Sequence, residues 1–270
     1  MDKTKIDWCD STWNPVTGCF HGCEYCYARR IAKRFGCASE THHNETVGDE
    51  CQWMTEAEGI IHVLNEPIYD YDYGRNAPYP YEFDPTFHKY RLNEYQNKKG
   101  RNIFVCSMAD LFGEWVPDEW IEEVFEACEK SPQHNYLFLT KNPKRYEKIL
   151  DRYMPPNMWF GWSQTGPMGN KCDFSTYHSI KTFISIEPLL EPFKEFHMKG
   201  VDWVIIGAET GQRKNKVVPK REWIEDIVNE CREVNISVFM KSSLANVWGE
   251  PLIQEFPVEL RNENLKFKEK

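Results

Sequence analysis

The second half of the chain alternates short apolar runs with amphipathic segments. Six apolar runs rich in β-branched and aromatic residues predict buried strands at 101–106, 136–140, 158–162, 181–186, 201–206 and 237–240. A helix that starts at Pro117 and another at about 221–233 each carry a single apolar stripe. Repeated alternation of strand and helix predicts a parallel sheet, so the expected fold class is α/β.

The number of strand candidates favours a partial or full (β/α) barrel over a flat sheet. A chain of 270 residues can form such a barrel as a single domain, which we expect to span residues 1–270. The segment from 37 to 100 lacks clear periodicity, apart from a candidate strand within 83–91. We therefore expect an irregular insertion at about residues 37–80. Its tyrosines are expected to anchor it to the body of the protein, with stacking on a planar substrate as the alternative.

Charge and hydropathy exclude some partners. Lys and Arg total 33 and Asp and Glu total 42, which gives a formal net charge of −9 and lowers the expectation of a large nucleic-acid partner. The basic cluster within 29–34 is read as a solvated helix face, with a local basic groove as the alternative. No apolar run approaches the roughly 18–20 residues of a membrane span, and no apolar signal segment is visible near the N-terminus. We expect a cytoplasmic protein without membrane contact.

Ten cysteines raise the question of which of them carry chemistry. Cys128 and Cys231 fall on the apolar stripes of the two predicted helices, so we expect both in the core. Cys19, Cys23 and Cys26 have the spacing Cys-x3-Cys-x2-Cys, with an aromatic residue directly before the last cysteine. Three thiolates can fill three corners of a tetrahedral metal site or of an iron–sulfur cubane, which leaves one position open for a ligand.

This cysteine motif resembles the signature of radical S-adenosylmethionine (SAM) enzymes. Further segments look like a largely uncharacterised bacterial and phage family of radical-SAM-like three-cysteine proteins, and they lie at 13–19, 104–112, 138–141, 184–188 and 204–211. The family is more distantly similar to spore photoproduct lyase. The resemblance runs from about residue 7 to about residue 241, with an interruption at 37–66. The run Gly207-Ala208-Glu209 departs from the pattern, because a second glycine is expected there in many relatives.

The resemblance implies a [4Fe–4S] cluster on Cys19, Cys23 and Cys26, with SAM bound to the fourth iron. One electron, supplied by an external donor of the flavodoxin or ferredoxin type, would cleave SAM to a 5′-deoxyadenosyl radical that abstracts a substrate hydrogen. The similarity to spore photoproduct lyase suggests a nucleic acid or nucleotide as substrate, with a small metabolite or a peptide as the open alternatives. The residues expected to contact SAM are Ser107 and Asp110 near the methionine end, Ser163, Glu187 and Glu209 near the ribose or adenine, and Tyr25 beside the cluster and the adenine.

Two alternatives to this enzyme remain open. One is a non-catalytic interaction module that binds zinc or an iron–sulfur centre, with His21 as the fourth zinc ligand, although its place between two cysteines makes simultaneous ligation awkward. The other is a thiol redox protein that uses Cys23 and Cys26, which leaves Cys19 without a role. The remaining cysteines lack ligand spacing and are read as ordinary thiols: Cys9, Cys37, Cys51, Cys106 and Cys172.

Overall fold

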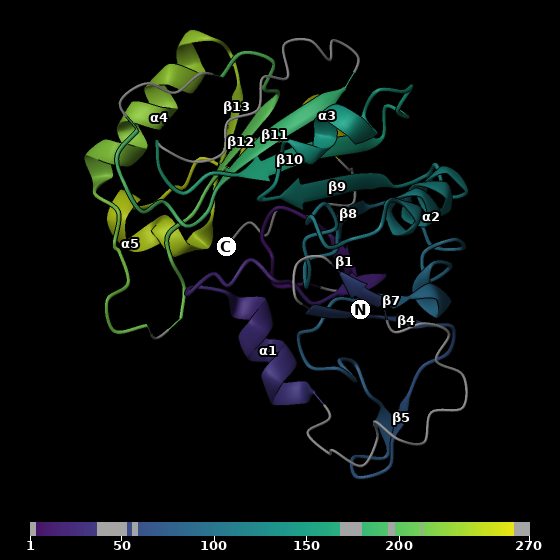
Figure 1. Cartoon of the computed structure of the whole chain (residues 1–270). Coiled ribbons are helices and arrows are strands. Elements are labelled where there is room, and N and C mark those ends of the chain that lie inside the picture. The colour runs from purple at the N-terminus through teal and green to yellow at the C-terminus, as the bar shows by residue number, and fades with distance from the viewer. Residues whose placement is uncertain are drawn as a thin grey trace. The chain divides into compact units, whose positions relative to one another are not determined.

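The computed structural model of the chain (Figure 1) divides into two compact units. It describes residues 4–36, 53–55, 59–167, 180–193, 198–211 and 213–261. Unit 1 comprises Met1–Thr12, Gly100–Phe104 and Gln133–Lys270, and unit 2 comprises Trp13–Lys99 and Val105–Pro132. Cys37, Cys51 and Cys172 lie outside the described residues. That residues 1–270 form one domain stays a prediction.

A seven-stranded sheet forms the centre of unit 1, in the order β1-β8-β9-β10-β11-β12-β13. Its strands are β1 (Ser11–Trp13), β8 (Asn102–Val105), β9 (Asn135–Thr140), β10 (Met158–Ser163), β11 (Lys181–Ile186), β12 (Trp203–Ile206) and β13 (Ser237–Met240). Pairing from β9 to β13 is parallel, with Gly161 opposite Phe183. The first and last strands are not neighbours, so the sheet is a curled, open half-barrel. The prediction of an α/β partial barrel is confirmed.

Helices of unit 1 follow the strands of the sheet. They are α3 (Arg145–Ile149), α4 (Arg221–Glu233) and α5 (Ala245–Trp248), with 3-10 turns η4 (Ser242–Leu244) and η5 (Val258–Leu260). Helix α4 packs against β13 and buries Ile224, Ile227 and Val228 together with Cys231. The Cys231 side chain is fully buried, which confirms its predicted place in the core, and burial raises its thiol pKa to about 12.

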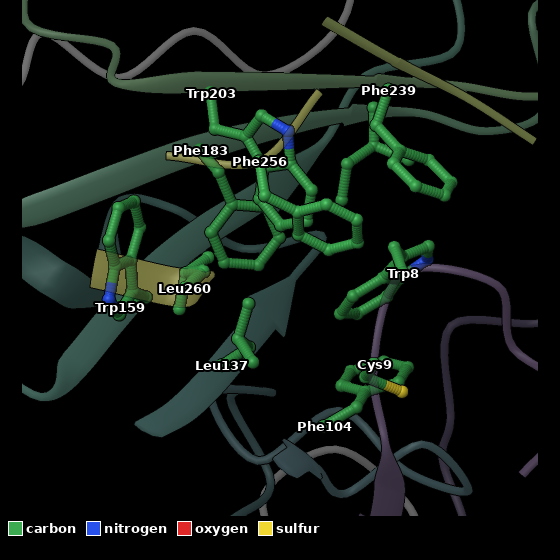
Figure 2. Close-up of a cluster of buried hydrophobic side chains, with 11 residues drawn as sticks. Trp8, Cys9, Phe104, Leu137, Trp159, Phe183, Trp203, Phe239, Phe256 and Leu260 are labelled. Atoms are coloured by element: carbon green, nitrogen blue, oxygen red, sulfur yellow. The ribbon is translucent and has the colours of Figure 1, made fainter. Parts of the chain in front are cut away.

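Aromatic side chains fill the core of unit 1, as Figure 2 shows. Trp203 lies at its centre, with ring centroids 5.4 Å from Phe256, 6.0 Å from Phe183 and 6.3 Å from Trp8. Trp8 precedes the first strand and Phe256 follows the last one, so both ends of this unit's chain close over the same core. Burying such rings supplies most of the free energy that holds the unit together.

Unit 2 contains a smaller sheet with the order β2-β7-β4-β3 and a separate hairpin. Its elements are β2 (Val16–Thr17), α1 (Tyr27–Phe35), β3 (Trp53–Thr55), β4 (Gly59–Leu64), the hairpin strands β5 (Tyr69–Asp70) and β6 (Arg75–Asn76), β7 (Thr86–His88), η2 (Lys89–Arg91) and α2 (Asp118–Glu129). Strand β7 confirms the candidate strand within 83–91. Periodicity does not predict β4, although β4 pairs in parallel with β7.

Helix α2 forms as its sequence predicts. Pro117 is its N-cap residue, and Asp118 and Glu119 occupy the first turn, where acidic side chains interact favourably with the helix dipole. Cys128 is fully buried on the apolar stripe, which confirms its predicted place in the core, and this burial raises its thiol pKa well above the usual value. Across the described ranges, every helix is too short or too polar to cross a membrane.

The aromatic core of unit 1 predicts a large cost for a truncated ring. Phe183 is fully buried and packs against Trp8 and Trp203. Replacing it in Phe183→Ala should lower the free energy of unfolding by about 3–5 kcal/mol, because the substitution leaves a cavity. Denaturant titration measures the change. The matched control is Tyr153→Ala, at a ring that is 81% exposed, where a change within about 0.5 kcal/mol is expected. Equal effects in the two variants would contradict this description of the core.

Candidate functional site

The three-cysteine loop lies in unit 2 between β2 and α1. Two backbone hydrogen bonds fix the start of this loop. Gly18 N–H donates to the Met108 carbonyl at 2.9 Å, and Cys19 N–H donates to the Phe83 carbonyl at 3.1 Å. Gly18 has φ +86°, and a Cβ there would collide with the backbone carbonyl of Asp84. Only glycine therefore fits directly before the first cysteine.

The last cysteine of the loop begins helix α1. Cys26 is the N-cap residue, and its Sγ accepts a hydrogen bond from Arg29 N–H at 3.3 Å. Cys26 N–H donates to the Cys23 carbonyl at 3.2 Å, and the Arg29 guanidinium donates to the Cys19 carbonyl at 3.0 Å. The Cys26 sulfur therefore lies at the helix N-terminus, where the first backbone N–H groups have no partner within the helix.

All three cysteines of the loop are free and partly buried. The pKa of Cys19 is raised to about 12, mainly by burial and also by the charges of Asp110, Cys23 and Cys26, so the three sulfurs act on one another electrostatically. A bound metal reverses such a shift, because it favours the thiolate over the thiol. Three thiols on one loop fit an iron–sulfur cluster or zinc by donor chemistry. In the part of the chain that is described, however, no three His, Cys, Asp or Glu side chains are arranged to hold a metal ion.

A histidine within the loop is paired with a buried acid. His21 Nε2 lies 2.7 Å from Asp110 Oδ2, and the imidazole packs edge-on against Trp115 with ring centroids 4.9 Å apart. The other oxygen of Asp110, Oδ1, accepts the N–H of Phe112 at 3.1 Å. The resemblance implied a SAM contact for Asp110, and the zinc alternative used His21 as a ligand, but no pattern indicated that the two residues, 89 positions apart, form a pair.

Ser107 is tied to the segment that precedes the loop. Its hydroxyl donates to Asn14 Oδ1 at 3.1 Å, and the same oxygen accepts Met108 N–H at 2.9 Å. The Tyr27 hydroxyl donates to the Ser107 carbonyl at 2.6 Å. Sequence reasoning did not single out Asn14, whose side chain positions Ser107. Tyr25 is half-buried in the loop itself.

In unit 1, the other predicted site residues follow the carboxyl ends of parallel strands. Ser163 is the last residue of β10, and Glu187 comes directly after β11. Glu187 forms an ion pair with Lys241, which comes directly after β13. Gly207 follows β12, and a Cβ there would lie 3.0 Å from the Lys241 side chain and 3.3 Å from that of Glu187. The absent side chain at Gly207 thus leaves room for the ion pair.

Glu209 is held by an arginine. Arg213 donates to both carboxylate oxygens at 2.7 and 2.8 Å, and Val217 N–H donates to one of them at 3.3 Å. The Glu209 side chain is only 2% exposed. Hydrogen bonds from Arg213 lower the pKa of this carboxyl, so Glu209 is ionised at neutral pH. The pair therefore orders the loop after β12.

Comparison with known proteins assigns the chain to a family. Residues 3–254 match the model of a family described as "Protein of unknown function (DUF5131)". The chain belongs to this family. No curated protein matches the DUF5131 chain. Among solved structures, a cysteine-to-serine mutant of spore photoproduct lyase is similar to it, with 11% sequence identity and a TM-score of 0.45, over 89% of this chain and 79% of that chain.

The Glu209–Arg213 pair of this DUF5131 protein predicts a pH-dependent contribution to stability. Arg213→Met leaves a buried carboxylate unpaired and should lower the free energy of unfolding by about 2 kcal/mol at pH 7. The folded-state pKa of Glu209 is lowered, so the pair stabilises the fold above the usual glutamate pKa of about 4.3. The stabilisation is lost as the pH falls through the folded-state value, and the difference from the wild-type protein should shrink accordingly. Denaturant titrations from pH 7 down to about pH 3 measure it.

A bidentate pair on the surface of the same unit provides the matched control. Arg232 donates to both oxygens of Glu255 at 2.8 and 2.7 Å, but its side chain is 48% exposed. Arg232→Met should cost less than about 1 kcal/mol, because exposed ion pairs contribute little. If the two arginine variants lose equal stability, burial of Glu209 does not determine the strength of its pair.

Proposed function

We propose that this DUF5131 protein is a radical SAM enzyme whose [4Fe–4S] cluster is held by Cys19, Cys23 and Cys26. The observation that carries the proposal is a single loop with three free thiols at the spacing Cys-x3-Cys-x2-Cys, placed directly before a helix. When bound, the cluster supplies an electron for the reductive cleavage of SAM, and the product radical abstracts a hydrogen from the substrate.

The residues around the loop support this use of the cysteines. Gly18 and two backbone hydrogen bonds fix the position of Cys19, and the Arg29 guanidinium donates a hydrogen bond to the Cys19 carbonyl. Cys26 lies at the N-terminus of α1, and its Sγ accepts the N–H of Arg29. Asp110 is buried beside His21 and acts as a positioning residue for the loop. With three cysteine ligands, a cubane keeps one iron open for SAM.

The residues expected to contact SAM stay part of the proposal. Tyr25, Ser107 and Asp110 belong to unit 2, and Ser163, Glu187 and Glu209 belong to unit 1. The structure shows protein partners for several of these side chains, since Arg213 occupies both oxygens of Glu209 and Lys241 pairs with Glu187. A hydroxyl or amino group of SAM would therefore either form a hydrogen bond next to these ion pairs or displace Arg213 or Lys241 from them. The proposal further includes an external one-electron donor and a nucleic acid or nucleotide as substrate.

Anaerobic reconstitution with iron and sulfide tests the assignment of the cysteines. The wild-type protein should take up about four irons and release 5′-deoxyadenosine when it is reduced with SAM. The variant Cys19→Ala/Cys23→Ala/Cys26→Ala should bind no cluster and release no 5′-deoxyadenosine. Iron analysis and chromatography of the nucleoside products give the two readouts.

A cysteine outside the loop provides the control for that experiment. Cys231 is fully buried in the core of unit 1, and Cys231→Ala should retain the full iron content and the full product yield. A folded wild-type protein that binds no cluster under these conditions would contradict the proposal. Equal iron contents in the triple variant and the wild-type protein would contradict it as well.

One observation favours the alternative of a zinc-binding interaction module. His21 Nε2 is bonded to Asp110, and carboxylates commonly orient metal-bound histidines through the second ring nitrogen in this way. In that case, the three cysteines and His21 would form a closed four-ligand site, which is typical of structural zinc. This module would bind a partner without catalysis.

The variant His21→Ala separates the two functions. If the cluster has only cysteine ligands, His21→Ala should keep about four irons per chain after reconstitution, although the loop loses its bond to Asp110. If the site is structural zinc, the same variant should lose most of the zinc bound by the wild-type protein, because one of four ligands is gone. Elemental analysis of the purified proteins gives the result. Loss of iron in His21→Ala would contradict the three-cysteine assignment.

A further inference from the structure

Exposed aromatic and basic side chains gather on the hairpin β5–β6 and at the end of α1. The aromatic–basic patch consists of Arg34, Phe35, Tyr69, Tyr71, Tyr73 and Arg75. Tyr71 is 80% exposed and Tyr73 is 71% exposed. The expectation that the tyrosines of this segment anchor it is therefore wrong for these two. The Tyr71 ring packs edge-on against that of Tyr69, with centroids 5.1 Å apart, so the exposed rings form a cluster.

The cations of the patch lie against its rings. The Arg75 guanidinium carbon is 5.5 Å from the ring centroid of Tyr73 and 5.9 Å from that of Phe35, and the Arg34 guanidinium carbon is 5.3 Å from Phe35. These are cation–π distances. Arg75 thereby joins the hairpin to the end of α1, so that the two elements form one surface within unit 2.

Helix α1 brings basic side chains to this surface. Helix α1 has the sequence YARRIAKRF, with four basic residues and no acidic one, in a chain with a net charge of −9. Arg30 and Lys33 are exposed on the helix. The hairpin contributes Asp72 as an exposed acid, whereas Asp70 is buried and accepts the N–H groups of residues 72 and 73. Glu82, which lies beside Gly36 at the end of α1, is a second exposed acid. Among these described residues, the basic side chains outnumber the acidic ones.

We propose that the aromatic–basic patch, together with the neighbouring Arg30 and Lys33 of α1, binds single-stranded nucleic acid. Bases stack on Tyr71 and Tyr73, and phosphates are bound by Arg30, Lys33 and Arg34. Exposed rings interleaved with cations are what an unpaired strand needs, because every base offers a face for stacking and every linkage carries one negative charge. In a duplex the bases are already stacked on one another, so the rings would gain no contact. The proposal goes beyond the cluster chemistry and does not depend on it.

Fluorescence anisotropy of the metal-free full chain with labelled oligothymidine and oligouridine of about 15 nucleotides tests this surface. At about 50 mM salt, both oligonucleotides should bind, and a duplex of the same length should bind at least about tenfold more weakly. An oligonucleotide of abasic sites carries the same phosphates without bases. It should also bind at least about tenfold more weakly, because it removes only the stacking.

Variants separate stacking from charge. Tyr71→Ala/Tyr73→Ala should weaken binding at least about tenfold, while Tyr71→Phe/Tyr73→Phe should bind as the wild-type protein does. Lys33→Ala/Arg34→Ala should reduce the slope of log affinity against log salt by about 1.4, or about 0.7 for each lost phosphate contact. The matched controls lie in unit 1: Tyr153→Ala removes another exposed tyrosine, and Lys199→Ala/Lys220→Ala removes two other exposed charges. Neither control should alter binding.

Three results would overturn the proposal. One is the absence of binding to either oligonucleotide at low salt. Another is equal binding of the abasic and the normal strand, which would indicate an anionic polymer without bases as the partner. The third is equal loss in the hairpin variants and the unit 1 controls. None of these outcomes bears on the cluster, because iron content and SAM cleavage are measured separately.

Discussion

Burial on both faces of the parallel sheet is the constraint that determines where unit 1 can place charged side chains. Strands β9 to β13 are buried along nearly their whole length. Charged groups are therefore found where the strands stop, as Glu187 and Lys241 are. A partly buried charge is costly without a partner, and these two residues satisfy each other across Gly207. Glu209, which follows β12, is likewise buried and forms an ion pair with Arg213.

The fold of unit 1 could be predicted closely from sequence. The apolar run at 181–186 and the stripe at 221–233 coincide with β11 and α4 in the structure. Local pattern suffices here because each strand of a parallel sheet is buried by helices next to it in sequence. In the small sheet of unit 2, β7 was predicted within 83–91, but β4 was missed, because it pairs with a strand 24 positions further along the chain and belongs to no repeating pattern. Even so, the sequence of β4, GIIHVL, is a short apolar run that could have marked it as a strand.

The sequence indicated which residues belong to the candidate site, but it did not indicate the contacts that hold them. Spacing alone singled out Cys19, Cys23 and Cys26, because ligands on one short loop are a local feature. The partners that hold the loop are distant in sequence: Asp110 for His21, and the carbonyl of Phe83 for Cys19. No pattern in a single sequence reports such pairs. The same limit applies to Tyr71 and Tyr73, whose exposure is evident only from the folded hairpin.

The central claim is that three cysteines hold a cluster with one iron open to SAM. Electron paramagnetic resonance of the reconstituted, reduced protein, recorded with and without SAM, tests it most directly. We predict the signal of a reduced [4Fe–4S] cluster and a change in its shape when SAM is added, because SAM binds the iron that lacks a cysteine. A cluster signal that is identical with and without SAM would contradict the claim, since a closed site gives that result. Zinc in place of a cluster would contradict it as well.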